Sequence, residues 1–138
     1  MNMKELKIDA TIQNLDEVLA FLDGELEAME CGMKEQIQLD VAVEEIFVNI
    51  ASYAYNPEIG PATISCEVSE DPLEVTISFM DSGVPYDPLA KEDPDVTLSA
   101  EERQIGGLGI YMVKKSMDNV SYEYKDGQNI FTIKKSLE

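Results

Sequence analysis

Apolar and polar residues recur along the chain with two different periods, and the changes between them predict the order of helices and strands. Residues 4–10 alternate between polar and apolar positions, as a strand with one covered face does. The segments 14–30 and 33–55 instead carry apolar residues three and four positions apart, which predicts two amphipathic helices. Asn14 is expected to cap the first of these helices, and Cys31-Gly32 is expected to end it.

Four further strands are predicted as two hairpins. Residues 63–69 and 73–79 alternate on either side of a short turn. Residues 120–125 and 129–135 alternate on either side of Asp126-Gly127, a dipeptide typical of a two-residue hairpin turn.

The stretch between the two hairpins has no clear period. Residues 86–105 contain two prolines and six acidic residues, and a loop of this length in a compact domain is either functional or disordered. A lid over a binding site is the functional form. A third helix is expected from the glycines that follow to about Met117. The order of elements predicts a single α+β domain over residues 1–138, a two-layer sandwich in which three helices cover one face of a mixed, mostly antiparallel sheet.

Composition narrows the classes of partner. The formal net charge is −18, and only ten of the 138 residues are Lys or Arg, so neither nucleic acid nor an anionic membrane is expected as a partner. A protein, or a nucleotide bound with a cation, fits better. Two cysteines without any histidine predict reduced thiols rather than a zinc site or a disulfide framework. The sequence shows neither a signal peptide nor a membrane-spanning apolar run, so a cytoplasmic protein is expected.

Glu45 and Asn49 are the first candidate pair. They lie four residues apart on the second helix, hence on one face and one turn from each other, at the edge of its apolar stripe. A carboxylate there can handle a proton, and an amide can hold a metal. The plainer interpretation is that both are solvated polar residues of an amphipathic helix. Glu44 is a competing carboxylate, but helical rotation turns it away from Asn49.

Asp81 is the most informative single residue. It continues the strand parity that carries Val75, Ile77 and Phe79 to the covered face, and a carboxylate buried there must find a donor. In the segment Asp81-Ser82-Gly83-Val84-Pro85, Gly83 leaves space for a packed ring and Pro85 fixes the exit of the loop. The alternative is an ordinary turn, since Asp, Ser, Gly and Pro are common turn residues.

The segment Gly106-Gly107-Leu108-Gly109-Ile110 opens the predicted third helix. Unpaired backbone N–H groups at a helix N-terminus bind phosphate, and glycines let the backbone come close. The alternative is a glycine-rich hinge at the end of the lid. The segment is not a Walker loop, since GxxxxGK[ST] is absent, and it does not follow a strand as a Rossmann motif would.

In this order and spacing, the three segments resemble the nucleotide pocket of the GHKL superfamily (gyrase B, Hsp90, histidine kinases, MutL), and specifically its bacterial anti-sigma-factor serine kinases. The resemblance covers residues 4–136, and Pro85-Tyr86-Asp87-Pro88 follows the same branch. It implies the Bergerat ATP-binding fold.

The resemblance also implies a role for each motif residue. Glu45 is the general base, Asn49 binds the Mg²⁺ that bridges the phosphates, and Asp81 accepts a hydrogen bond from the adenine amino group. The glycine segment binds the phosphates. Arg103, the only arginine, lies three residues before these glycines, where lid closure would deliver a cation to the γ-phosphate; a surface ion pair is the alternative, and the lid arginine of related kinases lies slightly closer to the glycines.

Two positions depart from the family pattern. Relatives often carry His-Gly where this chain has Tyr53-Ala54. Many superfamily members also have a threonine near the last strand that completes the adenine site; Asn129 stands close to that point and could substitute through its amide, while Thr132 lies further on.

The leading hypothesis is a Mg-ATP-dependent serine/threonine kinase of the anti-sigma-factor type that phosphorylates a STAS-type (anti-anti-sigma) protein. The alternatives are a nucleotide-gated binding module that captures its partner without phosphorylating it, and a plain ATPase. A sigma factor as partner and homodimerisation follow from the resemblance alone, and the acidic first helix disfavours an acidic partner.

Overall fold

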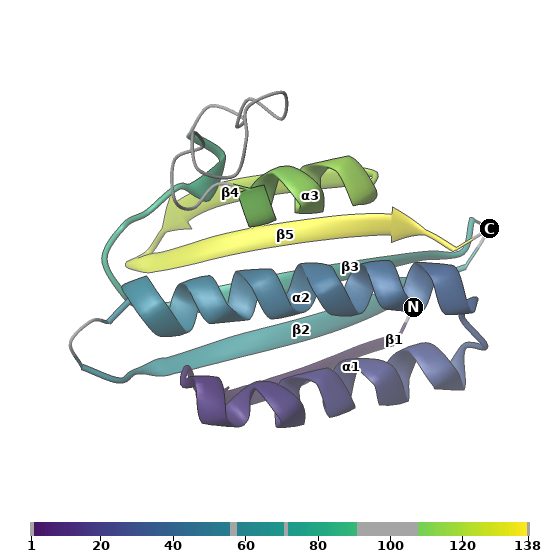
Figure 1. Ribbon diagram of the computed structural model, residues 1–138, viewed down its shortest axis with the longest axis horizontal. Coiled ribbons are helices and arrows are strands. Elements are labelled where there is room, and N and C mark those ends of the chain that lie inside the picture. The colour runs from purple at the N-terminus through teal and green to yellow at the C-terminus, as the bar shows by residue number, and fades with distance from the viewer. Residues whose placement is uncertain (1, 56–57, 71, 91–107, 138) are drawn as a thin grey trace.

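The computed structural model describes residues 2–55, 58–70, 72–90 and 108–137. Within them the chain forms a sheet of five strands in the order β1-β2-β3-β5-β4, with the helices on one face (Figure 1). The strands are β1 (Asn2–Asp9), β2 (Pro61–Ser69), β3 (Glu74–Asp81), β4 (Asn119–Lys125) and β5 (Gln128–Ser136). The helices are α1 (Leu15–Ala28), α2 (Met33–Tyr53) and α3 (Leu108–Ser116), with short 3₁₀ turns η1 (Ile12–Asn14) and η2 (Pro88–Ala90).

This arrangement confirms the predicted α+β sandwich and both hairpins. The expected mixed sheet is wrong in one respect, because every strand pairing in the described residues is antiparallel. The chain runs through two helices between β1 and β2 and returns antiparallel to its start, and β5 inserts between β3 and the edge strand β4. At the β4–β5 turn, Asp126 and Gly127 both have positive φ, 54° and 79°, which is the turn geometry that this dipeptide favours.

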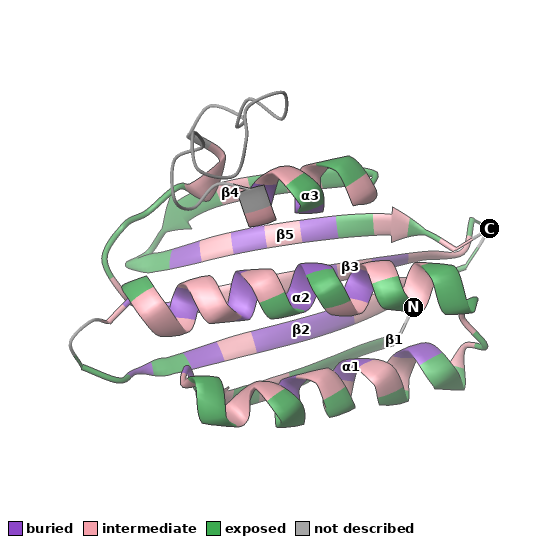
Figure 2. Ribbon diagram, viewed as in Figure 1, coloured by how far each residue is buried: buried purple, intermediate pink, exposed green. Residues whose placement is uncertain are grey.

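The core lies between the sheet and the helices (Figure 2). Strand alternation carries Val75, Ile77 and Phe79 of β3 inward, and the apolar stripe of α2 meets them from the other layer. Leu39, Val43 and Phe47 of that stripe are all fully buried. Truncating a buried aromatic such as Phe79 to Ala would cost about 3–5 kcal/mol of stability.

Two local predictions have different outcomes. The amide of Asn14 does not cap α1; it donates a hydrogen bond to the Asp9 carbonyl oxygen over 2.9 Å and so holds the end of β1. The expected free thiols are confirmed, because Cys31 and Cys66 are both unpaired. Burial raises the pKa of the Cys66 thiol to about 11, which keeps it protonated and unreactive.

The predicted lid is described only at its beginning. Residues 86–90 end in the turn η2, whereas 91–107, which include Arg103, Gly106 and Gly107, lie outside the described residues. None of the described helices is long and apolar enough to cross a membrane.

Candidate functional site

A pocket opens at the end of β3, under the C-terminal half of α2. It is walled mainly by apolar and aromatic side chains of α2, α3 and the sheet. Its lining includes Ile46, Ile50, Tyr53, Phe79, Val84, Tyr86, Ile110, Tyr122 and Phe131. The polar side chains Asn49, Asp81 and Asn129 also reach it. An apolar cavity with a few convergent polar groups is the usual form of a small-molecule site.

Asp81 lies at the inner end of this pocket. It is the last residue of β3 and is only 5% exposed, so the inward direction predicted from strand parity is confirmed. Its Oδ1 atom accepts two hydrogen bonds, from the Gly83 backbone N–H and from the side-chain amide of Asn129, each over 2.9 Å. These donors are what a buried carboxyl needs to remain in place.

Gly83 was predicted to leave space for a packed ring, but in the structure the space that its missing side chain leaves is filled by Ala54. A Cβ atom there would lie 2.2 Å from the Ala54 carbonyl oxygen. That carbonyl already accepts the Val84 N–H over 3.0 Å. The loop after β3 is therefore packed directly on the end of α2, and neither Gly83 nor the exposed Pro85 lines the main pocket.

Glu45 and Asn49 lie on one side of α2, as predicted, but they face different neighbours. Asn49 lines the pocket, whereas the carboxyl of Glu45 lies against the start of α3, where a Cβ on Gly109 would be 2.0 Å from its Cδ atom. Burial, and then the charge of Glu44, raise the pKa of the Glu45 carboxyl. Glu44 itself is exposed, which agrees with the predicted rotation away from the site.

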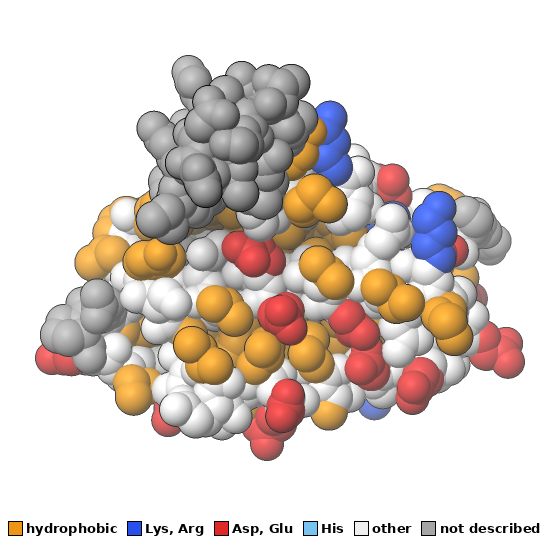
Figure 3. All heavy atoms as spheres, viewed as in Figure 1, with side chains coloured by type: hydrophobic (Ala, Val, Ile, Leu, Met, Phe, Trp, Pro, Cys, Tyr) orange, Lys and Arg blue, Asp and Glu red, His pale blue; other side chains and the backbone are white. Residues whose placement is uncertain are grey.

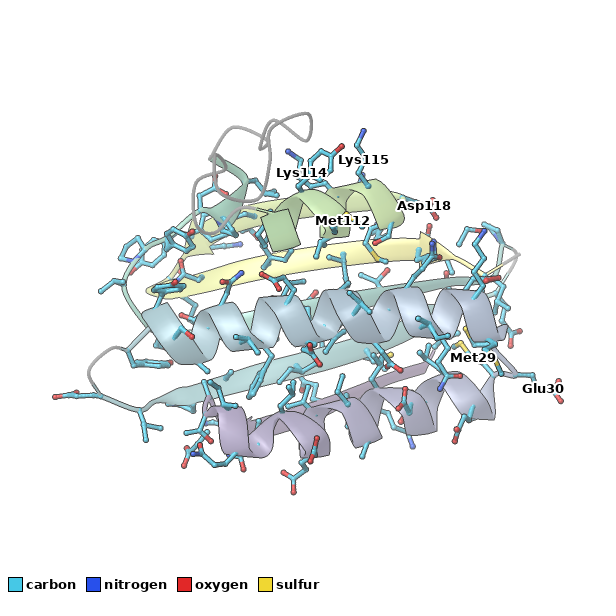
Figure 4. All side chains as sticks on the ribbon, in the orientation of Figure 1. Met29, Glu30, Met112, Lys114, Lys115 and Asp118 are labelled. Atoms are coloured by element: carbon cyan, nitrogen blue, oxygen red, sulfur yellow. The ribbon has the colours of Figure 1, made fainter. Side chains whose placement is uncertain are left out.

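The first residues of α3 reach the pocket from above. Ile110 is buried and lines it, and Gly109 packs on Glu45. Lys114 and Lys115 project from the last turn of α3 on the side away from α2 (Figure 4). Positive charges are favourable there, because the C-terminal end of a helix carries a partial negative charge. The N-terminus of α3 is thus next to the cavity that Asp81 and Asn49 share.

Asn129 is the functional candidate that sequence reasoning underrated. It is 6% exposed and pairs in register with Asp81 across β3 and β5. Its amide donates to Asp81 Oδ1 and to the Val84 carbonyl, and its Oδ1 accepts from the Tyr86 N–H and the Tyr122 hydroxyl. The signal that could have found it is parity, because Phe131 and Ile133 place position 129 on the covered face.

The described residues could bind a metal ion only together with a bound ligand that supplies further oxygen atoms. They contain no group of three Asp, Glu, Cys or His side chains that could hold an ion by itself. Asn49, however, offers an amide oxygen in the pocket wall. Mg²⁺ is commonly held by one or two protein oxygens together with substrate phosphates, and this donor set suits that arrangement.

Comparisons with known proteins agree with the fold. The model of the histidine kinase-like ATPase domain matches residues 8–135. The serine/threonine-protein kinase BtrW of Bordetella bronchiseptica is 27% identical over 128 residues, which cover 93% of this chain and 89% of that protein.

Two solved structures share the fold. The crystal structure of the RsbU and RsbW domains of a Mycobacterium tuberculosis protein matches with a TM-score of 0.71 at 16% identity; the match covers 99% of this chain and 33% of that one. In the SiaB-SiaC complex from Pseudomonas aeruginosa, the matched chain gives a TM-score of 0.59 at 18% identity and coverage of 95% and 89%.

These matches confirm the predicted resemblance to the anti-sigma-factor kinases. The family model extends from the end of β1 to the end of β5 and includes both Asp81 and Asn49. The chain therefore belongs to the histidine kinase-like ATPase domain family.

Proposed function

We propose that the protein is a cytoplasmic Mg-ATP-dependent serine/threonine kinase of the anti-sigma-factor type, with a STAS-type protein as its substrate. The observation that carries this proposal is the convergence of Asp81 and Asn49 on one apolar cavity beside the N-terminus of α3. The BtrW relative is named a kinase, which supports the reaction type.

The adenine ring would occupy the apolar inner part of the pocket. Ile50 and Phe79 would contact its faces, and Asp81 would accept a hydrogen bond from the 6-amino group. The triphosphate would then extend toward the N-terminus of α3, whose N–H groups favour anions. Gly83 serves this site indirectly, because its close packing on Ala54 holds the loop that forms the rim.

The phosphate end of the site is assigned to α2. Asn49 would bind Mg²⁺, which would neutralise the charge of the bridged phosphates. Glu45, one turn earlier, would take the proton from the attacking serine or threonine hydroxyl. A carboxyl whose pKa is raised by burial and by Glu44 is better suited to that task than an ordinary glutamate.

The proposed partner is a protein. A chain of this fold has been solved in the SiaB-SiaC complex, which supports a protein partner. On the helix-covered side of this molecule, Met33, Ile37 and Val41 form an exposed stripe along α2, with acidic side chains around them (Figure 3). A partner that binds there needs apolar and basic groups. A sigma factor or a second copy of the chain would have to meet the same requirement.

Labelled ATP and a candidate STAS protein test the kinase assignment. Glu45→Ala should keep affinity for Mg-ATP within about threefold and lower phosphotransfer by about 10²–10⁴-fold, since a general base contributes that much. Glu27→Ala, which removes a carboxylate from an exposed position on α1, is the matched control and should retain transfer. Equal loss of binding and transfer in Glu45→Ala would contradict the base role.

One observation favours a second function, a nucleotide-gated binding module. The Glu45 carboxyl lies against Gly109 and is not part of the pocket wall, so it meets a substrate only if the bound substrate reaches the start of α3. If nucleotide binding shifts α3 so that the partner's hydroxyl cannot reach that place, the protein would capture its partner and leave it unmodified. An ATP-dependent complex without phosphorylated partner would favour this module over the kinase.

A further inference from the structure

The side chain of Asn129 has only one orientation that satisfies its neighbours. The backbone N–H of Tyr86 can only donate, and it lies 3.1 Å from one end of the amide. The carbonyl of Val84 can only accept, and it lies 2.9 Å from the other end. The oxygen of Asn129 must therefore face Tyr86, and its NH₂ group must face Val84 and Asp81.

This orientation determines what Asp81 does. The NH₂ group of Asn129 donates to Asp81 Oδ1, and the Gly83 N–H donates to the same atom. Asp81 Oδ2 receives no donor from the described residues, and Asp81 lines the pocket. The direction of hydrogen bonding therefore runs from Tyr86 and Tyr122 through Asn129 to Asp81, and ends on an acceptor that is open to a ligand.

We propose that Asn129 is the positioning residue that sets base specificity, by holding Asp81 as a hydrogen-bond acceptor for a purine amino group. Adenine presents a donor at position 6, whereas guanine presents an acceptor there. With guanine, the oxygen at position 6 would face Asp81 Oδ2, so that two buried acceptors would lie opposite each other. This arrangement weakens binding strongly when water is excluded. This inference rests on the proposed ATP site and adds to it a determinant outside the three motifs.

The same amide also fixes the rim of the pocket. Val84 and Tyr86, which Asn129 holds through their backbones, both line the cavity, and the Tyr86 ring lies 6.3 Å from the ring of Tyr53. One side chain thus links the base-reading carboxyl to the loop that covers the base.

Calorimetry with ADP and GDP, which differ only in the base, tests the proposal. Asn129→Asp keeps the shape of the side chain but turns the donor that faces Asp81 into an acceptor. The preference for ADP over GDP should fall by at least about tenfold. Asn119→Asp adds the same charge at an exposed position on the neighbouring strand β4 and should leave that preference unchanged.

A purely structural role for Asn129 predicts a different result. Binding of ADP and GDP would then weaken by the same factor, and an unchanged ratio would overturn the proposal. If Asn129→Asp does not fold, Asn129→Leu takes its place, because leucine is of similar volume and has no donor. Its preference for ADP over GDP should fall at least about threefold. An unchanged ratio again overturns the proposal. A wild-type protein that binds neither nucleotide would overturn the proposed ATP site as well, whereas wild-type ADP binding with an unchanged ratio overturns only the role of Asn129.

Discussion

The carboxyl of Glu45 occupies the space above Gly109, so closely that a Cβ at that glycine would lie 2.0 Å from the carboxyl carbon. The proposed base on α2 and the proposed phosphate-binding end of α3 are thus in direct contact. The Glu45 carboxyl can occupy this position only because residue 109 is a glycine and has no side chain.

Gly109→Ala should therefore impair chemistry more than folding. The displaced group is the end of a flexible side chain, and alanine in a helix is favoured over glycine by about 1 kcal/mol, so stability should change little. Phosphotransfer should fall at least about tenfold as Glu45 is pushed aside. Gly24→Ala in α1 is the control, because a Cβ at that position meets no atom within 4 Å. It should stabilise the fold by about 1 kcal/mol and leave transfer intact. Unchanged transfer in Gly109→Ala would contradict the role of this contact.

Gly83→Ala should disrupt both the fold and nucleotide binding. The new Cβ would meet the backbone of Ala54, which cannot rotate away, so the rim loop must lift off α2. We expect a loss of about 2 kcal/mol or more in thermal unfolding and a clear loss of ATP affinity. Ser82→Ala, one residue earlier and exposed, serves as the control for both measurements. Retained ATP affinity in Gly83→Ala would show that the rim position is unimportant.

Tyr55 joins three segments near the pocket. Its hydroxyl donates to the Pro61 carbonyl over 2.6 Å and accepts from the Ser82 N–H over 2.8 Å. Tyr55→Phe should cost about 0.5–1.5 kcal/mol of stability, because the Ser82 N–H and the Pro61 carbonyl exchange the hydroxyl for water. Tyr53→Phe removes a hydroxyl from an exposed ring and should unfold at the wild-type temperature. Equal melting temperatures for the two variants would contradict this account.

Stability should fall as pH rises from about 4 to 7, through Asp40 of α2. Burial, then a hydrogen bond with Asp23 of α1 and the charge of that carboxyl, raise the Asp40 pKa from 3.8 to about 7. The native state then binds more protons than the unfolded state within this window, so deprotonation favours unfolding.

Asp40→Asn removes that titration and should melt at a higher temperature than wild type at pH 8, with the difference shrinking toward pH 5. Thermal melts across this range measure it. Glu27→Gln, at an exposed position on α1, is the control that removes one charge without this pH dependence. A difference between Asp40→Asn and wild type that does not vary with pH would contradict the assignment.

Local patterns in the sequence predicted most elements and the burial of Asp81. Strand parity is a property of a few neighbouring residues, so it placed position 81 inward without knowledge of the rest of the sheet. Helical rotation likewise separated Glu45 from the exposed Glu44.

Features that depend on distant segments could not be predicted in this way. The pairing of Asp81 with Asn129 requires β5 to insert beside β3, and strand order is a long-range property. For the same reason the sheet was expected to be mixed, and the contact of Glu45 with α3 was not foreseen. The amide of Asn14 matched a cap by its residue type, but the Asp9 carbonyl, brought close by the turn η1, accepts its hydrogen bond instead.

The most direct test is calorimetry of Mg-ATP binding to wild type and Asp81→Asn. This variant can keep an oxygen toward Gly83 and Asn129 while it replaces only the open acceptor Oδ2 with a donor. We predict that wild type binds Mg-ATP and that Asp81→Asn, folded to the same melting temperature within a few degrees, binds it at least about 100-fold more weakly. Equal affinity of the two proteins for Mg-ATP would contradict the claim that this pocket reads adenine.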